Sequence, residues 1–279
     1  MVTTRDENLD TSRMDNFDVT LIATRRPEVL DLTLRSFYNN LLSNFRSIRL
    51  FVNIDPIWGD EKDDANVELI CKKYFTEVHI RRPDTASFGA AVQWVWGRTT
   101  SRWFLHLEDD WLLARKISPE HLERELADVT VGQVHLKNGS RSRRLLRPVR
   151  NRLKQGRPGA EKFPLPLTTS PGFIHADFAS VALQYLDPNL DPERQFSLGY
   201  NPSGAAALKC FHPKKYGNVF TPSLLYDTGR AWRLARGKTK RLVAGKSIWE
   251  DSPVSSGPFV EQMARFEKIL KRSQSLPAV

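Results

Sequence analysis

The chain has 279 residues, of which 40% are hydrophobic and 27% are charged. This length and composition allow a substantial core and are typical of soluble globular proteins. No run of about eighteen apolar residues occurs, so no membrane span is predicted, and Cys71 and Cys210 form no CxxC pair or disulfide framework. Residues 1–16 lack an apolar segment, which predicts a disordered lead-in rather than a secretory signal and, with the cysteine usage, a cytoplasmic location.

The net charge of +10 is unevenly distributed along the chain. Residues 1–136 carry 17 Lys and Arg against 22 Asp and Glu, whereas residues 137–279 carry 25 against 10. The segment 137–162 alone holds ten basic side chains and one acid, and we interpret it as a basic loop. Such a cluster attracts phosphates of nucleic acids, lipid headgroups or substrates, so peripheral contact with an anionic membrane is one expectation.

Short apolar runs alternate with helical periodicity over the first 111 residues. Strands are predicted at 17–24, 48–54, 78–80 and 103–107. Each of the first three strands is followed by a predicted helix, the first of which has Pro27 in its opening turn. A further helix is predicted at 120–127, where Ser118 is the N-cap. These repeated units imply an α/β fold with a doubly wound, mostly parallel sheet and right-handed crossovers.

The fourth predicted strand ends in three consecutive carboxylates, Glu108, Asp109 and Asp110. Three acids in one place repel one another unless a positive charge lies between them, and a divalent cation that carries phosphate oxygens meets this need. The alternative is a solvated loop. Capping of the next helix is not the explanation, because Ser118 lies between the triplet and that helix.

Polar residues also follow the earlier strands. Thr24 and Arg25 follow the first strand, Asp55 the second, and a loop beginning at Asp84 the third. In a parallel sheet all carboxyl ends share one edge, where ligands bind. We therefore expect these residues and the acidic triplet to converge on one crevice.

In order and spacing, these motifs resemble the nucleotide-sugar-binding half of a GT-A-type, family 2-like glycosyltransferase. The matching segments are Thr24-Arg25-Arg26-Pro27, Asp55, Ser87-Phe88-Gly89-Ala90-Ala91 and Glu108-Asp109-Asp110. The resemblance implies a donor site that includes Thr24, Arg25, Arg26, Ser87 and Glu108. It further implies that Asp55 contacts the nucleoside, that Asp109 lies near the ribose, and that Asp110 binds Mn²⁺ or Mg²⁺ at the diphosphate. For Asp55, a turn before Pro56 is an equal alternative.

The second half has weaker signals. A strand is predicted at 132–136, a strand or helix within 168–183, a helix capped by Asp191, and helices at 203–211 and 260–270. Val219, Phe220, Leu224 and Leu225 suit a strand. His106 is interpreted as a core residue, because the six histidines lack metal-ligand spacing.

The resemblance implies that the second half supplies a general base and residues that bind the metal ion and the diphosphate. The expected position of a general base, at Asn201-Pro202-Ser203, holds no carboxylate. Glu193 is therefore the first candidate base and Asp191 the second, with Asp177, Glu250 and Asp251 as further candidates. Asp227 is expected to be a metal ligand and Arg230 to meet the diphosphate, although Asp227-Thr228-Gly229 is also typical of a plain turn.

The resemblance thus implies a metal-dependent, inverting enzyme that moves a sugar from a nucleotide-sugar donor to a glycan or lipid-linked acceptor. Bacterial surface-polysaccharide assembly at the cytoplasmic face of the inner membrane is the expected setting. Residues 17–136 would form the nucleotide-sugar-binding half, and 163–279 the acceptor-side half of the same domain. A nucleotidyltransferase is an alternative, although the glycine-rich phosphate loop it needs is absent. A nucleic-acid-binding protein that uses Arg141 to Arg157 is the other, disfavoured alternative.

Overall fold

The structure is a computed structural model that describes residues 17–136, 167–197, 199–217, 221–243, 245–251 and 259–279. The lead-in predicted at 1–16 and the basic loop predicted at 137–162 lie outside the described residues. So do Val219 and Phe220, two of the four residues that suggested a late strand.

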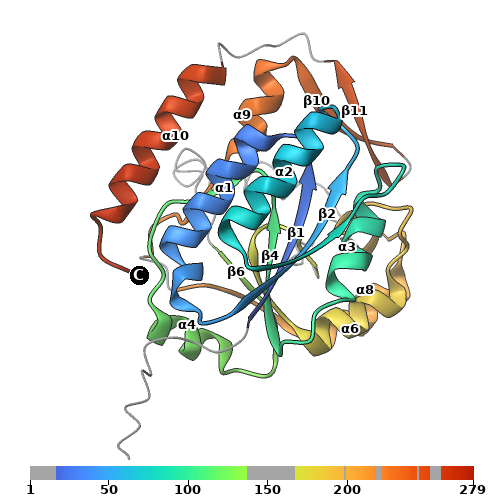
Figure 1. Cartoon of the computed structure of the whole chain (residues 1–279). Coiled ribbons are helices and arrows are strands. Elements are labelled where there is room, and N and C mark those ends of the chain that lie inside the picture. The colour runs from blue at the N-terminus through green and yellow to red at the C-terminus, as the bar shows by residue number, and fades with distance from the viewer. Residues whose placement is uncertain (1–16, 137–166, 198, 218–220, 244, 252–258) are drawn as a thin grey trace, which may run out of the picture.

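The first half folds as predicted. Its four strands are parallel neighbours in the order β3-β2-β1-β4, with bounds β1 (Phe17–Thr24), β2 (Ile48–Asp55), β3 (Glu77–Arg81) and β4 (Trp103–Glu108). The helices that connect them are α1 (Pro27–Asn40), α2 (Glu61–Tyr74) and α3 (Phe88–Trp96). β1, β2 and β4 point toward the top of Figure 1, and β3 runs parallel to β2, so the carboxyl ends of the four strands meet at one edge.

The second half extends the same sheet with a change of direction. β7 (Gly172–His175) pairs antiparallel with β4, β6 (Val131–His135) pairs antiparallel with β7, and β8 (His212–Lys215) pairs parallel with β6. The complete order is β3-β2-β1-β4-β7-β6-β8. The expected α/β class, with parallel strands in the first half and mixed directions beyond them, is confirmed.

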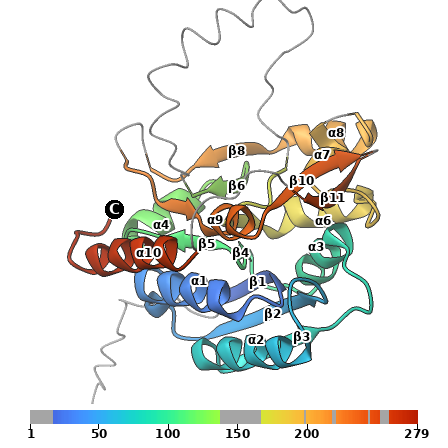
Figure 2. The ribbon, with the colours of Figure 1, turned by 90° about the horizontal axis from the view of Figure 1, so that it is seen from above.

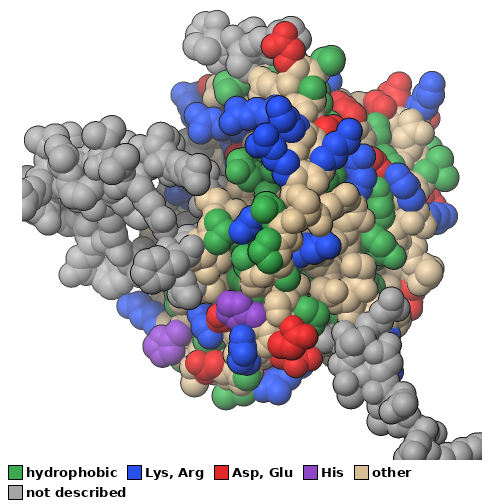
Figure 3. All heavy atoms as spheres, turned by 90° about the vertical axis from the view of Figure 1, so that its left-hand side faces the viewer, with side chains coloured by type: hydrophobic (Ala, Val, Ile, Leu, Met, Phe, Trp, Pro, Cys, Tyr) green, Lys and Arg blue, Asp and Glu red, His purple; other side chains and the backbone are tan. Residues whose placement is uncertain are grey.

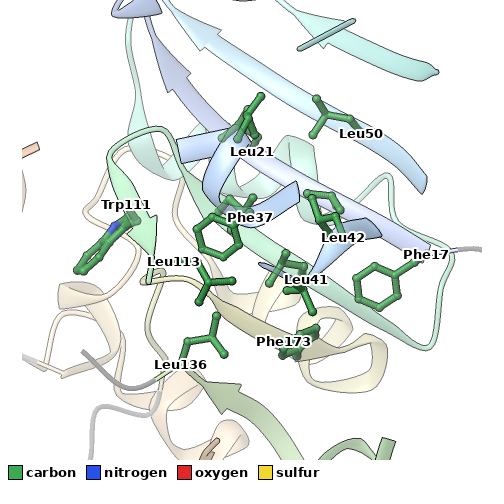
Figure 4. Packing of buried hydrophobic residues seen from close by; sticks show 14 of the residues in the cluster. Phe17, Leu21, Phe37, Leu41, Leu42, Leu50, Trp111, Leu113, Leu136 and Phe173 are labelled. Atoms are coloured by element: carbon green, nitrogen blue, oxygen red, sulfur yellow. The ribbon is translucent and has the colours of Figure 1, made fainter. Parts of the chain in front are cut away.

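Two apolar clusters cover the two faces of the sheet. One includes Leu34 and Phe37 of α1 and Leu122 of α4 (Pro119–Leu126), and Figure 4 shows its packing around Leu21 and Phe173. The other includes Val92 of α3 and Phe178 of α6 (Ala176–Tyr185). Seen from above in Figure 2, α1 and α4 lie on one side of the sheet and α3 and α6 on the other. The sheet is therefore the middle layer of three.

Helix boundaries follow local capping chemistry where the sequence carried a signal. Ser118 caps α4 with Pro119 at its first position, as predicted. Asp191 also caps as predicted, because Oδ1 accepts the backbone N–H groups of Glu193 and Arg194, and α7 (Arg194–Ser197) follows. The helix predicted at 203–211 is shorter, since α8 (Pro202–Ala207) gives way to a 3-10 turn (Leu208–Cys210).

The last part of the chain contains both predicted and unpredicted elements, since a strand begins at Leu225 as suggested, whereas the helix and the hairpin that follow it were not predicted. The segment 168–183, predicted as a strand or a helix, contains one of each, β7 followed by α6. Beyond it, β9 (Leu225–Asp227) pairs with β5 (Trp111–Leu113), α9 (Thr228–Ala235) follows directly, and β10 (Lys238–Val243) forms a hairpin with β11 (Lys246–Asp251). α9 was missed because its N-cap, Asp227, begins an Asp-x-Gly sequence that is common in turns.

The chain ends in α10 (Phe259–Gln274), which contains the helix predicted at 260–270. Its apolar face, with Phe266 and Leu270, packs near Leu32 of α1. Its outer face exposes Arg265, Lys268, Lys271 and Arg272, and Figure 3 shows Lys and Arg side chains gathered high on this side of the molecule. Within the described part of the chain, no helix has the length and apolar character needed to cross a membrane.

Candidate active site

A cleft of about 650 Å³ opens at the carboxyl ends of β1, β2 and β4. Its lining includes Thr24, Asp55 and all three acids of the triplet, Glu108, Asp109 and Asp110. These residues come from three separate strand ends that parallel pairing brings to one edge. Figure 2 looks down on this edge, where α9 lies beside α1 and the β10–β11 hairpin.

Asp109 is held by groups from the end of β1. Its Oδ2 accepts the backbone N–H and the hydroxyl of Thr24, both at 2.8 Å, and its Oδ1 accepts Nη2 of Arg26. Arg26 also donates from Nε to Thr24 Oγ1 at 2.7 Å. Burial lowers the pKa of Arg26, and the charges of Asp109 and Asp110 reverse this, so the pKa lies above its ordinary value. Both carboxylate oxygens of Asp109 are therefore used within the protein.

Asp110 is less completely bonded and faces the start of α9. Its Oδ2 accepts Nη2 of Arg26 at 3.1 Å and lies 3.7 Å from Nη1 of Arg233. The backbone N–H groups of Thr228 and Gly229 donate to its carbonyl oxygen at 2.9 and 3.2 Å. A Cβ atom on Gly229 would lie 1.8 Å from Asp110 Oδ2, so glycine is what lets α9 approach the triplet.

Asp227 lies beside Asp110 because β5 pairs with β9 in a register that sets Trp111 against Asp227. Burial raises the pKa of Asp227, and the nearby charge of Asp110 raises it further. Two partly buried carboxylates that repel each other fit a hard divalent cation, whose remaining ligands would come from phosphate oxygens or water. Among the described residues no group of three or more acidic, histidine or cysteine side chains is arranged to hold a metal ion. Asp110 and Asp227 would therefore share the ion with the ligand.

Asp55 is oriented by neighbours on β2 and at the start of α3. Its Oδ1 accepts Nδ2 of Asn53 at 2.8 Å, and Asn53 Oδ1 accepts Nη1 of Arg81 at 3.1 Å. Burial raises the pKa of Asp55, while the hydrogen bonds from Asn53 and from the backbone of Ser87 lower it. The carboxylate lines the cleft at 5% exposure, so it is a fixed hydrogen-bond acceptor.

Glu108 and Glu193 share one threonine. The hydroxyl of Thr169 lies 3.0 Å from Glu108 Oε1 and 3.1 Å from Glu193 Oε1, and Glu193 Oε1 also accepts from Thr168 Oγ1 and the Thr169 backbone N–H at 2.8 Å. Burial and the charges of Asp110 and Glu193 raise the pKa of Glu108 to about 8. One hydroxyl cannot donate to two carboxylates at once. The raised pKa of Glu108 favours its protonated form, which removes this competition for the Thr169 hydroxyl.

Asp191, the second candidate base, is occupied by structural contacts. Besides capping α7 through Oδ1, it has Nζ of Lys240 3.5 Å from Oδ2. The further candidates do not line the cleft: Asp177 is an exposed residue at the start of α6, and Glu250 and Asp251 pair with Arg241 and Lys238 on the hairpin. Of the five candidate bases, only Glu193 and Asp191 line the cleft, and Asp191 is engaged by its helix cap and by Lys240.

Three residues expected in the donor site do not line the cleft. Nε of Arg25 lies 3.4 Å from Oδ2 of Asp64. The hydroxyl of Ser87 donates to the carbonyl of Pro188 and accepts the backbone N–H of Ala90, so it caps α3. The side chain of Arg230 is exposed. Their proposed roles in ligand binding remain predictions.

The sequence interpretation missed several cleft residues, among them Trp58, Arg233, Lys240 and Trp249. Arg233 lies one helical turn beyond Arg230, so recognising Asp227 as an N-cap would have pointed to it. The other three carry no local signal. Trp58 belongs to the loop after β2, and Lys240 and Trp249 are cross-strand partners in the hairpin, so only tertiary packing brings them here.

No family model matches this chain, and no curated protein matches it in sequence. Solved structures match in fold. A mannosyltransferase from Pyrobaculum calidifontis in complex with GDP-Man and Mn²⁺ has a TM-score of 0.51 at 13% identity, over 78% of this chain and 60% of that one. S. aureus TarS 1-349 in complex with UDP has a TM-score of 0.50 at 11% identity, over 75% of this chain and 60% of that one. The chain thus matches about three fifths of each structure, and the likeness shows a GT-A fold.

Proposed function

We propose that this chain, which has the fold of the GT-A glycosyltransferases, transfers a sugar from a nucleotide-sugar donor to a hydroxyl group of an acceptor with the help of a divalent cation. The observation that carries the proposal is the pairing of Asp110 and Asp227 in the cleft, beside an Asp109 whose oxygens are already used. The fold and the chemistry of the site support the same reaction. Of the two solved structures with a similar fold, the mannosyltransferase contains GDP-Man and Mn²⁺, and TarS contains UDP.

On the donor side, the orientation of Asp55 supports recognition of a nucleobase. Its carboxylate can accept N–H groups from a base, as long as it stays ionised. Because the solved relatives hold GDP-Man and UDP, guanine and uracil are the first bases to test. Thr24 and Asp109, which are bonded to each other, would line the ribose side of the site.

Asp110 and Asp227 would hold Mn²⁺ or Mg²⁺ against the diphosphate, as argued from their mutual repulsion. When bound, such an ion stabilises as a Lewis acid the negative charge that develops on the leaving diphosphate. Arg26 and Thr24 would keep Asp109 from coordinating the ion, because together they occupy both of its carboxylate oxygens.

On the acceptor side, Glu193 is the proposed general base. The acceptor oxygen forms the new bond to the anomeric carbon, its proton passes to Glu193, and the bond to the diphosphate breaks with its electron pair on the phosphate oxygen. Thr168 and Thr169 fix Oε1 of Glu193, and among the described residues every hydrogen bond to this carboxylate ends on that oxygen. Attack from the face opposite the diphosphate would invert the anomeric configuration.

The acceptor class and setting are proposed from charge. Residues 137–279 carry 25 basic against 10 acidic side chains, which favours an acidic or lipid-diphosphate-linked glycan and contact with an anionic membrane surface. Surface-polysaccharide synthesis on the cytoplasmic side of the membrane is the setting that combines these features.

The testing experiment is calorimetric titration of UDP, GDP and their sugar derivatives, with Mn²⁺ or with EDTA. The variants are wild type, Asp110→Ala and, as a matched loss of one carboxylate, Glu123→Ala on the exposed side of α4. We expect Mn²⁺-dependent binding that Asp110→Ala abolishes and Glu123→Ala retains. If no nucleotide binds while DNA or RNA binds in a salt-sensitive manner, the basic surface is the functional one and the transferase proposal fails.

A further inference from the structure

Arg233 is a cleft cation that the proposed function has not used. Its side chain is 24% exposed and lines the cleft, with Nη1 3.7 Å from Asp110 Oδ2, beyond hydrogen-bonding distance. A guanidinium has five N–H donors arranged in a planar fork. Those donors lie next to the carboxylate pair with room for a further acceptor.

Three other cations line the cleft, namely Arg26, Lys240 and Arg194. Arg194 follows Glu193 directly in the chain at the start of α7, whereas the cations whose charges lower the pKa of Asp227 are Arg233 and Arg230. Arg26 is 6% exposed at its side chain and donates to Thr24, Asp109 and Asp110. Lys240 lies near Asp191 and 5.3 Å from the ring centre of Phe88, toward the acceptor side. Arg233 is therefore the described cation best placed to reach a ligand bound at Asp110 and Asp227.

Aromatic packing fixes the direction of Arg233. Its guanidinium carbon lies 5.5 Å from the ring centre of Trp249, and Trp58 packs edge-on against both Trp249 and Trp232, at 5.1 and 5.5 Å between ring centres. Trp58 has a φ of 72°, a left-handed conformation that a non-glycine residue keeps only where its surroundings impose it. The three tryptophans come from the loop after β2, from α9 and from β11.

We propose that Arg233 binds the diphosphate of the donor through its guanidinium fork and that Trp249 is a positioning residue for it. This inference rests on the proposed function. When the bond from the anomeric carbon to the diphosphate oxygen breaks, the electron pair remains on that oxygen, and the N–H donors of Arg233 stabilise the resulting charge together with the cation at Asp110. Diphosphate binding thus has two components, one that requires the metal and one that does not.

The test separates the phosphates from the nucleoside. Uridine, UMP and UDP, and the guanosine series, are titrated in EDTA and in Mn²⁺ into wild type, Arg233→Ala, Arg233→Lys and Trp249→Leu. Arg241→Ala removes the same charge from the exposed side of the hairpin, where Arg241 pairs with Glu250, and is the control. Thermal melting of each variant establishes that it is folded.

We expect Arg233→Ala to weaken diphosphate binding about tenfold to a hundredfold in both media and to leave nucleoside binding unchanged. Arg233→Lys should recover part of the loss and Trp249→Leu should show a smaller loss of the same kind, while Arg241→Ala binds like wild type. Equal losses for nucleoside and diphosphate, or no loss, overturn the inference while the proposed function stands. Failure of the wild type to bind any nucleotide overturns both.

Discussion

The donor and acceptor sides of the cleft hold their carboxylates in different ways. On the donor side Asp109 is 2% exposed, and both of its oxygens accept hydrogen bonds from Thr24 and Arg26. On the acceptor side Glu193 is held through Oε1 alone among the described residues, by two threonines of an irregular segment. A carboxylate bonded through both oxygens is suited to hold a geometry, whereas one with an open oxygen is suited to take a proton.

The largest effect is expected from Glu193→Gln, which tests whether Glu193 takes the proton of the acceptor. The amide keeps the shape but cannot accept the acceptor proton, so we expect the turnover rate to fall about a hundredfold to ten-thousandfold with nucleotide affinity unchanged. The rate is measured as nucleoside diphosphate released from the sugar nucleotide that binds most tightly. Asp191→Asn, which alters a neighbouring helix cap instead, should cost less than about 1 kcal/mol of stability and little activity. The reverse ranking would make Asp191 the base.

Gly229→Ala perturbs the donor side without changing any charge. The added Cβ would meet Asp110 Oδ2 at 1.8 Å, so either the carboxylate or the start of α9 must move. We expect Mn²⁺-dependent nucleotide binding to weaken about tenfold or more, since a displaced ligand is poorly compensated in a metal site. Titration of UDP or GDP with and without Mn²⁺ measures the effect, and an unchanged affinity would show that the contact of α9 with Asp110 is unimportant for the donor.

A buried histidine on β4, His106, leads to a prediction about how stability depends on pH. His106 is fully buried, and its Nδ1 accepts from Trp96 Nε1 at 3.0 Å. Burial lowers its pKa to about 3, whereas the unfolded chain binds the proton near 6.5. The free energy of unfolding should therefore decrease as the pH falls from 6.5 toward 3, at up to about 1.4 kcal/mol per pH unit.

His106→Gln removes this titration while keeping an acceptor for Trp96. Urea unfolding at pH 7 and pH 4.5 measures the free energy of unfolding of both proteins. The wild type should lose more stability between the two pH values than His106→Gln does. Equal losses would mean that other groups, such as the half-buried His135 with a pKa of about 4, account for the acid sensitivity.

The smallest expected effect concerns Arg230, the residue that sequence resemblance assigned to the diphosphate. Its side chain is exposed and does not line the cleft, so Arg230→Ala should weaken diphosphate binding by less than about threefold, through long-range charge alone. Titration of UDP or GDP beside Arg233→Ala checks this. If Arg230→Ala lost as much diphosphate affinity as Arg233→Ala, Arg230 would be a diphosphate-binding residue, as the resemblance implies.

The donor side was more predictable from sequence than the acceptor side for a physical reason. Each of its polar groups follows directly on a parallel strand, and parallel strands place their carboxyl ends together whatever the details of packing. Thr24, Asp55 and Asp109 could thus be assigned to one crevice from chain order. The same rule does not extend to side chains a little farther on, because Arg25, after β1, contacts Asp64, and Ser87, after β3, contacts Pro188.

By itself, the sequence determined the alternation of strands and helices in the first half, the caps at Ser118 and Asp191, and the identity of the acidic triplet, because these depend on apolar periodicity and on contacts a few residues apart. Three contacts could be seen only in the folded chain. Arg26 donates a hydrogen bond to Asp109, Arg233 rather than Arg230 lines the cleft, and the ring of Trp249 lies against the guanidinium of Arg233. The first contact joins residues 83 positions apart in the chain, and the other two depend on which face of α9 turns inward and on how the hairpin packs against it. Their geometry follows from how β9, α9 and the hairpin pack against the completed sheet, which no local pattern encodes.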